Sequence, residues 1–245
     1  MGLLAVFAIG GVLLASPGSA KEDLVVVDAR EILSEIRDGV VVERRHVRIV
    51  GSLDIRELDG PVRSSIAIVD CEIQDPVRME GASFDLPVRF EETTFENMVL
   101  FSGVQFNDSA DFSFATFEDT VFFDSAIFGK EAEFCGTGFG RDAYFSNSVF
   151  CGTCDFNFTR FAEEYVLFDG ASFFGDAHFE DAEFGRWTNF YGSRFYEGAD
   201  FLLATFPGRS FIANVTFDGD AKFAGVEFMS FAEFEDSTFE GDFFL

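Results

Sequence analysis

Basic side chains are scarce in this sequence. Its 245 residues include 17 Lys and Arg against 44 Asp and Glu, which gives a formal net charge of −27 at pH 7. Proteins bind nucleic acid through basic patches that contact phosphates, so this charge argues against nucleic acid as a direct ligand. The composition also argues against disorder, because a chain that is 48% hydrophobic and 17% aromatic can bury a core.

Tryptophan and tyrosine are almost missing from the aromatic residues. The chain has 1 Trp and 4 Tyr against 37 Phe. An imbalance of this size points to a repeated structural unit built around phenylalanine, so the first question is whether the Phe residues recur at a fixed period.

The first twenty residues have no charged side chain. Residues 2–15 are apolar, and the small residues Gly18 and Ala20 precede the charged run that starts at Lys21. This pattern predicts a secretory signal peptide over residues 1–20, cleaved after Ala20, although it lacks the usual basic start. The alternative is an uncleaved membrane anchor. Either reading places the rest of the chain outside the cytoplasm, secreted or in the cell envelope.

A short helix is predicted next. Asp28 and Glu31 form a capping-box pattern, and Gly39 stands where a C′ glycine would end the helix. Ala29, Ile32, Leu33 and Ile36 share one helical face. A helix over about residues 29–37 with this face would cap the end of a stacked-repeat structure, and a partner-binding helix is the alternative.

The remaining chain is one repeat. From Phe84 to Phe161 the Phe residues alternate in steps of six and five, an eleven-residue period, and after one seven-residue step the pattern continues from Phe168 to Leu245. Phe occupies all but two of these positions, the exceptions being Ile212 and Leu245. Extended upstream, the same phase predicts that Val62, Ile68, Cys71, Ile73, Val77 and Met79 point inward.

The residue two before each Phe is small or β-branched, as at Ala110 and Thr93. Positions two apart on an extended backbone face the same side. Each unit therefore predicts a very short strand with two inward residues, an outward residue between them, and a turn rich in Gly, Asp and Asn. Strands this short are stable when the chain winds into a coil and each coil pairs with the next through parallel strands about 4.8 Å apart.

Segments such as Ala82-Ser83-Phe84, Ala110-Asp111-Phe112 and Ala204-Thr205-Phe206 resemble the pentapeptide-repeat family, whose unit is a small residue, a polar residue, Leu or Phe and two turn residues. The resemblance covers about residues 62–245. It implies an all-β fold, a right-handed quadrilateral parallel β-helix with four units per coil. The alternating steps predict 22 residues per coil, and we attribute the extra corner residues to the space that Phe needs.

These observations divide the chain into residues 1–20 as signal peptide or anchor, residues 21–61 as an N-terminal cap with the helix and an irregular first coil, and residues 62–245 as the β-helix. The seven-residue step predicts a bulged corner around residues 162–165. The chain ends in phase at Phe243-Phe244-Leu245. An apolar coil end invites pairing, so we expect either that this C-terminal coil is buried in a homodimer or that a further domain has been lost.

No catalytic, cofactor-binding or metal-binding residues are predicted. Cys151 and Cys154 form a CxxC motif, but a zinc site needs a second CxxC or suitably spaced histidines, and the repeat explains the cysteine positions as structural thiols. A disulfide is the alternative reading. His178 occupies an outward slot and is predicted to be a surface residue.

The sequence therefore predicts an exported, non-enzymatic solenoid that presents an acidic surface for protein binding or structural assembly, with an unknown partner. One alternative is a DNA mimic that inhibits or protects a type II topoisomerase, an activity known in one branch of the resembled family. A second is a β-helix enzyme or binder that acts on polysaccharide.

Overall fold

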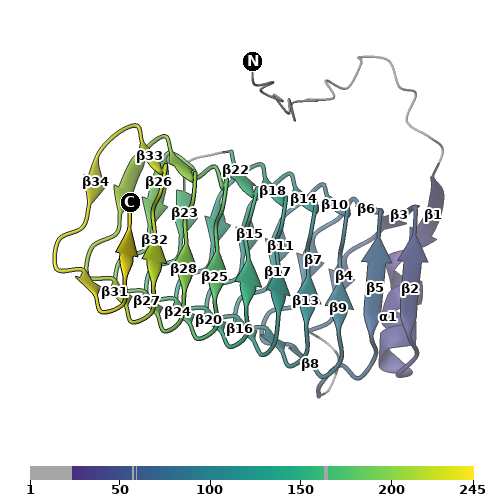
Figure 1. Ribbon diagram of the computed structural model, residues 1–245. Helices are drawn as coiled ribbons and strands as arrows, with labels where there is room; N and C mark the ends of the chain where they lie inside the picture. The colour runs from purple at the N-terminus through teal and green to yellow at the C-terminus, as the bar shows by residue number, and fades with distance from the viewer. Residues whose placement is uncertain (1–23, 57, 59, 163–164) are drawn as a thin grey trace, which may run out of the picture.

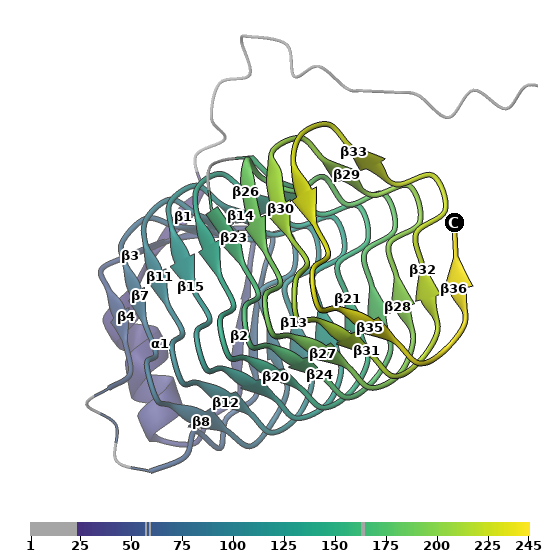
Figure 2. The ribbon, with the colours of Figure 1, turned by 90° about the vertical axis from the view of Figure 1, so that its left-hand side faces the viewer.

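The computed structural model describes residues 24–56, 58, 60–162 and 165–245, and in this part of the chain it forms a parallel β-solenoid of about ten turns with one α-helix. Figure 1 shows the coils stacked side by side along one axis, and Figure 2 shows the chain winding around that axis. The predicted parallel β-helix is confirmed. The predicted signal peptide or anchor lies outside the described residues.

The helix lies at the N-terminal end of the stack (Figure 1). Helix α1 spans Ala29–Arg37, as predicted, and the Asp28 side chain caps it by accepting a hydrogen bond from the Arg30 backbone N–H. Gly39 follows with a positive φ of 69°. Ala29, Ile32 and Ile36 are buried, so the apolar face of the helix covers the first coils.

Four flat faces form the wall of the solenoid, numbered here in the order in which the chain visits them. Face 1 consists of β1 (Val25–Asp28), β3 (Val47–Val50), β6 (Glu72–Ile73), β10 (Thr94–Phe95), β14 (Thr116–Phe117), β18 (Gly138–Phe139) and β22 (Arg160–Phe161), continued through bridges at Glu183 by β29 (Thr205–Phe206) and β33 (Glu227–Phe228). Face 2 consists of β4 (Leu53–Asp54), β7 (Val77–Arg78), β11 (Val99–Leu100), β15 (Val121–Phe122), β19 (Ala143–Tyr144), β23 (Tyr165–Leu167), β26 (Trp187–Asn189), β30 (Arg209–Phe211) and β34 (Ala232–Glu233).

Face 3 consists of β8 (Ser83–Phe84), β12 (Gln105–Phe106), β16 (Ile127–Phe128), β20 (Val149–Phe150), β24 (Ser172–Phe173), β27 (Arg194–Phe195), β31 (Thr216–Phe217) and β35 (Thr238–Phe239). Face 4 consists of β2 (Val42–Arg45), β5 (Ile66–Val69), β9 (Val88–Arg89), β13 (Ala110–Asp111), β17 (Ala132–Glu133), β21 (Cys154–Asp155), β25 (Ala177–His178), β28 (Ala199–Asp200), β32 (Ala221–Lys222) and β36 (Phe243–Phe244). Faces 2 and 4 are therefore opposite walls.

The coil length is 22 residues over most of the solenoid. Phe95 pairs with Phe117, and Ala110 pairs with Ala132. Val42 of β2 instead pairs with Ile66 of β5, so the coil between them contains two more residues. The seven-residue step adds one residue, because Phe139 pairs with Phe161 whereas Ala143 pairs with Val166. The insertion is thus located within residues 162–165, but residues 163–164 of the predicted bulge lie outside the described residues.

The core consists of phenylalanine rings in columns. Phe134 stacks between Phe112 and Phe156 of the neighbouring coils, at centroid distances of 5.1 and 4.7 Å. It also meets Phe123 and Phe145 edge to face at 5.6 Å. All of the upstream residues predicted to point inward are buried, namely Val62, Ile68, Cys71, Ile73, Val77 and Met79.

The two kinds of step make different corners. In a five-residue step the amide of Val104 donates to the carbonyl of Phe101, and Gly103 between them has a φ of 67°. This is a type II turn, which needs a left-handed third residue. The six-residue steps turn without a left-handed residue. Glycines at these corners allow the backbones of neighbouring coils to approach closely, since a Cβ on Gly175 would lie 2.5 Å from the backbone of Gly152.

Phe134→Ala tests the column core. The substitution removes a fully buried ring from two stacked contacts and three edge-to-face contacts, so it should lower the free energy of unfolding by ~3–5 kcal/mol. Chemical denaturation followed by circular dichroism measures this difference. The outward substitution Gln105→Ala is the control and should change stability by about 0.5 kcal/mol or less. Equal effects of the two substitutions would contradict the column core.

Candidate functional site

Carboxylates gather on face 4 and its preceding corner. On this face the outward slots of successive coils hold Asp111, Glu133 and Asp155 in direct register. The acidic surface, as we call it, comprises these three residues, Glu131 on the coil of Glu133, and the residues toward the C-terminus, which are Asp176, Glu197, Asp200, Asp220 and Asp242. It follows from the repeat, because an outward slot on a parallel face is stacked on the same slot one coil away.

The stacked carboxylates repel one another. Partial burial raises the pKa of the Glu133 carboxyl, and the charges of Asp155, Asp111 and Glu131 raise the same pKa further. The residues that follow on the face alternate in charge. Lys222 Nζ lies 3.0 Å from Asp200 Oδ2, and this contact raises the pKa of the lysine. Like charges are therefore concentrated at the middle of the solenoid.

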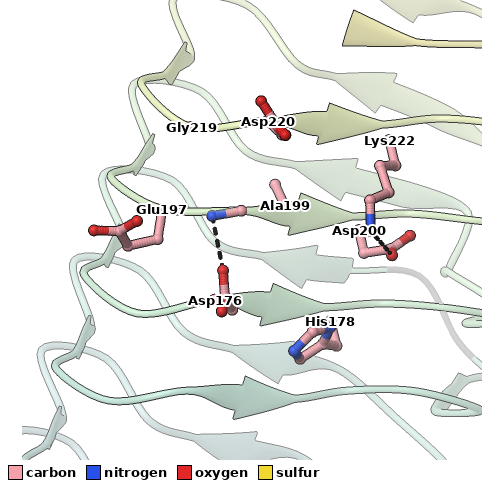
Figure 3. Close-up of a pocket in the computed structure, with 9 residues that line it drawn as sticks. Asp176, His178, Glu197, Ala199, Asp200, Gly219, Asp220 and Lys222 are labelled. Atoms are coloured by element: carbon pink, nitrogen blue, oxygen red, sulfur yellow. Dashed lines mark hydrogen bonds and ion pairs between the residues drawn. The ribbon is translucent and has the colours of Figure 1, made fainter. Parts of the chain in front are cut away.

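A hollow of about 450 Å³ lies at the C-terminal part of the acidic surface. Figure 3 shows its polar side chains, which come from three successive coils and which are Asp176, His178, Glu197, Asp200, Asp220 and Lys222. One Asp176 oxygen accepts a hydrogen bond of 2.9 Å from the Gly198 amide. Four carboxylates against one lysine would favour a cationic guest. Among the described residues, no group of three His, Cys, Asp or Glu could hold a metal ion.

The opposite wall is apolar and aromatic. On face 2 the outward slots from Leu100 to Phe211 are uncharged, and the Phe122 and Tyr144 rings stack at 4.9 Å with an interplanar angle of 11°. Trp187, one slot earlier on its coil, lies 4.8 Å from the Phe211 ring. The sequence analysis missed this surface. Reading every twenty-second residue from Leu100, with one extra residue at the seven-residue step, would have found it.

The structure separates the two thiols of the CxxC motif. Cys154 is buried in an inward slot of face 4, and burial raises the pKa of its thiol well above the ordinary value. Cys151 is exposed beyond face 3, and all four cysteines are free. The predicted role as structural thiols fits Cys71 and Cys154, which fill the core. His178 lies on the outer side of the wall, as predicted, between Asp155 and Asp200.

The last coil leaves apolar side chains exposed. Four exposed apolar residues lie there, namely Phe234, Phe243, Phe244 and Leu245. An apolar hollow at this end is lined by three of them, Phe234, Phe243 and Leu245, together with Phe223, Val226, Phe228 and Phe239. This surface is the one that motivates the homodimer through the C-terminal coil, which stays a prediction. In the described part of the chain, no helix has the length and apolar character needed to cross a membrane.

Glu133→Gln tests the charge repulsion on face 4. The folded state raises the pKa of Glu133, so its ionised form costs stability above the folded pKa, and the cost disappears below the ordinary value of 4.5. The substitution should raise the free energy of unfolding at pH 7 by ~0.5 kcal/mol, and the gain should vanish on acidification to about pH 4. Urea unfolding at both pH values measures it, with Glu227→Gln on face 1 as control. A loss of stability at pH 7 would refute the repulsion.

Comparison with known proteins agrees with the repeat. Residues 101–149, which span parts of all four faces, match the family model described as pentapeptide repeats with 9 copies. Neither a curated protein nor a solved structure matches the chain. The same Phe-centred unit forms coils on both sides of the matched residues. Residues 101–149 therefore carry the pentapeptide repeat, with phenylalanine at the centre of the unit.

Proposed function

We propose that this protein is an exported, non-enzymatic scaffold that binds a cationic protein partner through the acidic surface of face 4. The observation that carries the proposal is the register of Asp111, Glu133 and Asp155 on consecutive coils. Like charges in direct register destabilise a sheet, so their use on three neighbouring strands favours a role outside folding. A cationic partner would relieve the repulsion on binding.

The geometry supports binding of an extended basic segment. The carboxylates stand on strands about 4.8 Å apart, and the stacked rings beneath them fix that spacing. A rigid surface loses little conformational entropy when it binds. Long-range attraction from a net charge of −27 would also speed association with a basic partner at low ionic strength.

Binding of a Lys-rich peptide of about ten residues tests the acidic surface. The double substitution Glu131→Gln/Glu133→Gln should weaken this binding about 3- to 10-fold, from the loss of two charge contacts worth roughly 0.2–1 kcal/mol each. Isothermal titration at low and high salt measures the affinity, which should fall as salt rises.

The matched control is Glu118→Gln/Glu227→Gln, which removes the same charge from face 1 and its neighbouring corner. It should leave the affinity nearly unchanged. Equal weakening by both double variants would show that only net charge matters and would refute a role for face 4. Inhibition of gyrase supercoiling would favour the topoisomerase alternative, and retention on a glycan panel would favour the polysaccharide alternative.

Export forms a separate part of the proposal. It rests on the uncharged apolar run at residues 2–15 and the small residues that follow it. Mass spectrometry of protein recovered from the producing cell should find a mature chain that begins at Lys21, outside the cytoplasm. A chain that keeps residues 1–20 and sediments with membranes would support the anchor instead. Intact protein in the cytosol would refute both.

A further inference from the structure

The outward column of face 2 starts with Asp54 and Arg78, ends with Glu233, and carries no charge between Arg78 and Glu233. The strip, as we call it, comprises its eight residues from Arg78 onward, which are in register on successive strands and are Arg78, Leu100, Phe122, Tyr144, Leu167, Asn189, Phe211 and Glu233. The six residues between Arg78 and Glu233 are uncharged and half-buried, and all of them except Asn189 are apolar or aromatic. Apolar rows on the outer face of a protein mark interaction sites.

The rings of this strip are stacked on one another. Phe122 and Tyr144 belong to neighbouring coils and are nearly parallel at 4.9 Å, so each covers one face of the other and the ring edges point outward. A sugar ring stacks on an exposed aromatic face, and in this arrangement the stacked faces of Phe122 and Tyr144 are covered. Ring edges suit packing against other apolar side chains. The strip therefore favours a protein surface over a glycan.

A second copy of the chain matches the spacing of the strip. Any other copy carries the same row of side chains at the same strand spacing of about 4.8 Å, so contacts made at one coil repeat at the next. A two-fold axis across the strip, midway between Tyr144 and Leu167, would bring these two residues together. It would also place Leu100 opposite Phe211 and Phe122 opposite Asn189.

The charges select this antiparallel arrangement. The same axis places Arg78 opposite Glu233 at both ends of the strip, whereas parallel copies would oppose Arg78 to itself. Neither residue has a salt-bridge partner within 4.0 Å among the described residues, and Asp54 lies next to Arg78 on the neighbouring strand of the same column. Three residues before the strip positions of their coils, Asp119 would face Arg186. The acidic surface lies on the opposite wall, so the two acidic surfaces would point away from each other.

We propose that face 2 is a self-association surface on which two copies of this chain pack side by side and antiparallel, with Arg78 of each copy against Glu233 of the other. This arrangement differs from a dimer through the C-terminal coil. It is also independent of the binding proposed for face 4, which stays accessible on both copies.

A charge swap tests the proposal. Arg78→Glu or Glu233→Arg alone creates two like-charge pairs per dimer and should raise the dissociation constant about 10-fold or more. The double variant Arg78→Glu/Glu233→Arg restores opposite charges and should return the constant to within about 3-fold of the parent. Sedimentation equilibrium of the purified protein over a range of concentrations measures it, and circular dichroism checks that each variant is folded.

A second set of variants locates the interface. Phe122→Ser/Phe211→Ser should abolish the dimer, whereas the face 3 substitution Ile127→Ser and the C-terminal substitution Phe244→Ser should not weaken it. A dimer lost only on Phe244→Ser would replace the proposal with the C-terminal interface. A monomer at every concentration, or no rescue by the charge swap, would overturn it. A monomer that binds neutral lipid vesicles through Phe122 and Phe211 would overturn it in favour of a membrane surface.

Discussion

Parallel strands on successive coils lie about 4.8 Å apart, and stacked aromatic rings prefer nearly the same separation. In this solenoid the step from one coil to the next therefore satisfies the hydrogen bonding of the strands and the stacking of the rings together. Phe173 and Phe195 stack at 4.5 Å while their own strands, β24 and β27, are hydrogen-bonded neighbours. Rings within one coil meet edge to face, as Phe134 and Phe145 do, or tilted, as Phe134 and Phe139 do. Phenylalanine is thus suited to the axial and the lateral contacts at once, which explains why it dominates the composition.

Because the core depends on inward slots, the outward slots are free to differ between walls. Strand β17 on face 4 and strand β19 on face 2 both have an inward alanine, Ala132 and Ala143. Their outward residues differ, because β17 carries Glu133 and β19 carries Tyr144. A change at an outward slot leaves the ring columns intact. The repeat then builds any surface as a row, since one slot recurs every 22 residues. A stripe of charge and a stripe of aromatic edges are therefore the natural products of this fold.

Much of the fold could be predicted from the sequence because the period is strict. The coil length and the inward residues from Val62 onward follow from the phenylalanine period, and the helix over residues 29–37 follows from its capping residues and apolar face. The corners could not be predicted in the same way. Phe114 and Phe158 hold left-handed positions with φ of 57° and 58°, which composition would assign to glycine. The rows of outward residues on faces 2 and 4 also escaped prediction, since each row appears only when the outward residues of its own face are read on their own.

The two phenylalanines at left-handed corners show how far the coil dictates local conformation. A left-handed residue with a side chain costs roughly 1–2 kcal/mol, yet the turn after face 4 repeats this conformation on every coil from Asp70 to Gly225. Hydrogen bonds on both sides hold it, since the Phe114 amide donates to the Cys135 carbonyl and the Ala115 amide donates to the Phe112 carbonyl. The Phe114 ring lies over Gly136 of the next coil, where a Cβ would come within 2.6 Å of it. The strain is therefore local, and the periodic ladder on either side stabilises the turn whichever residue occupies it.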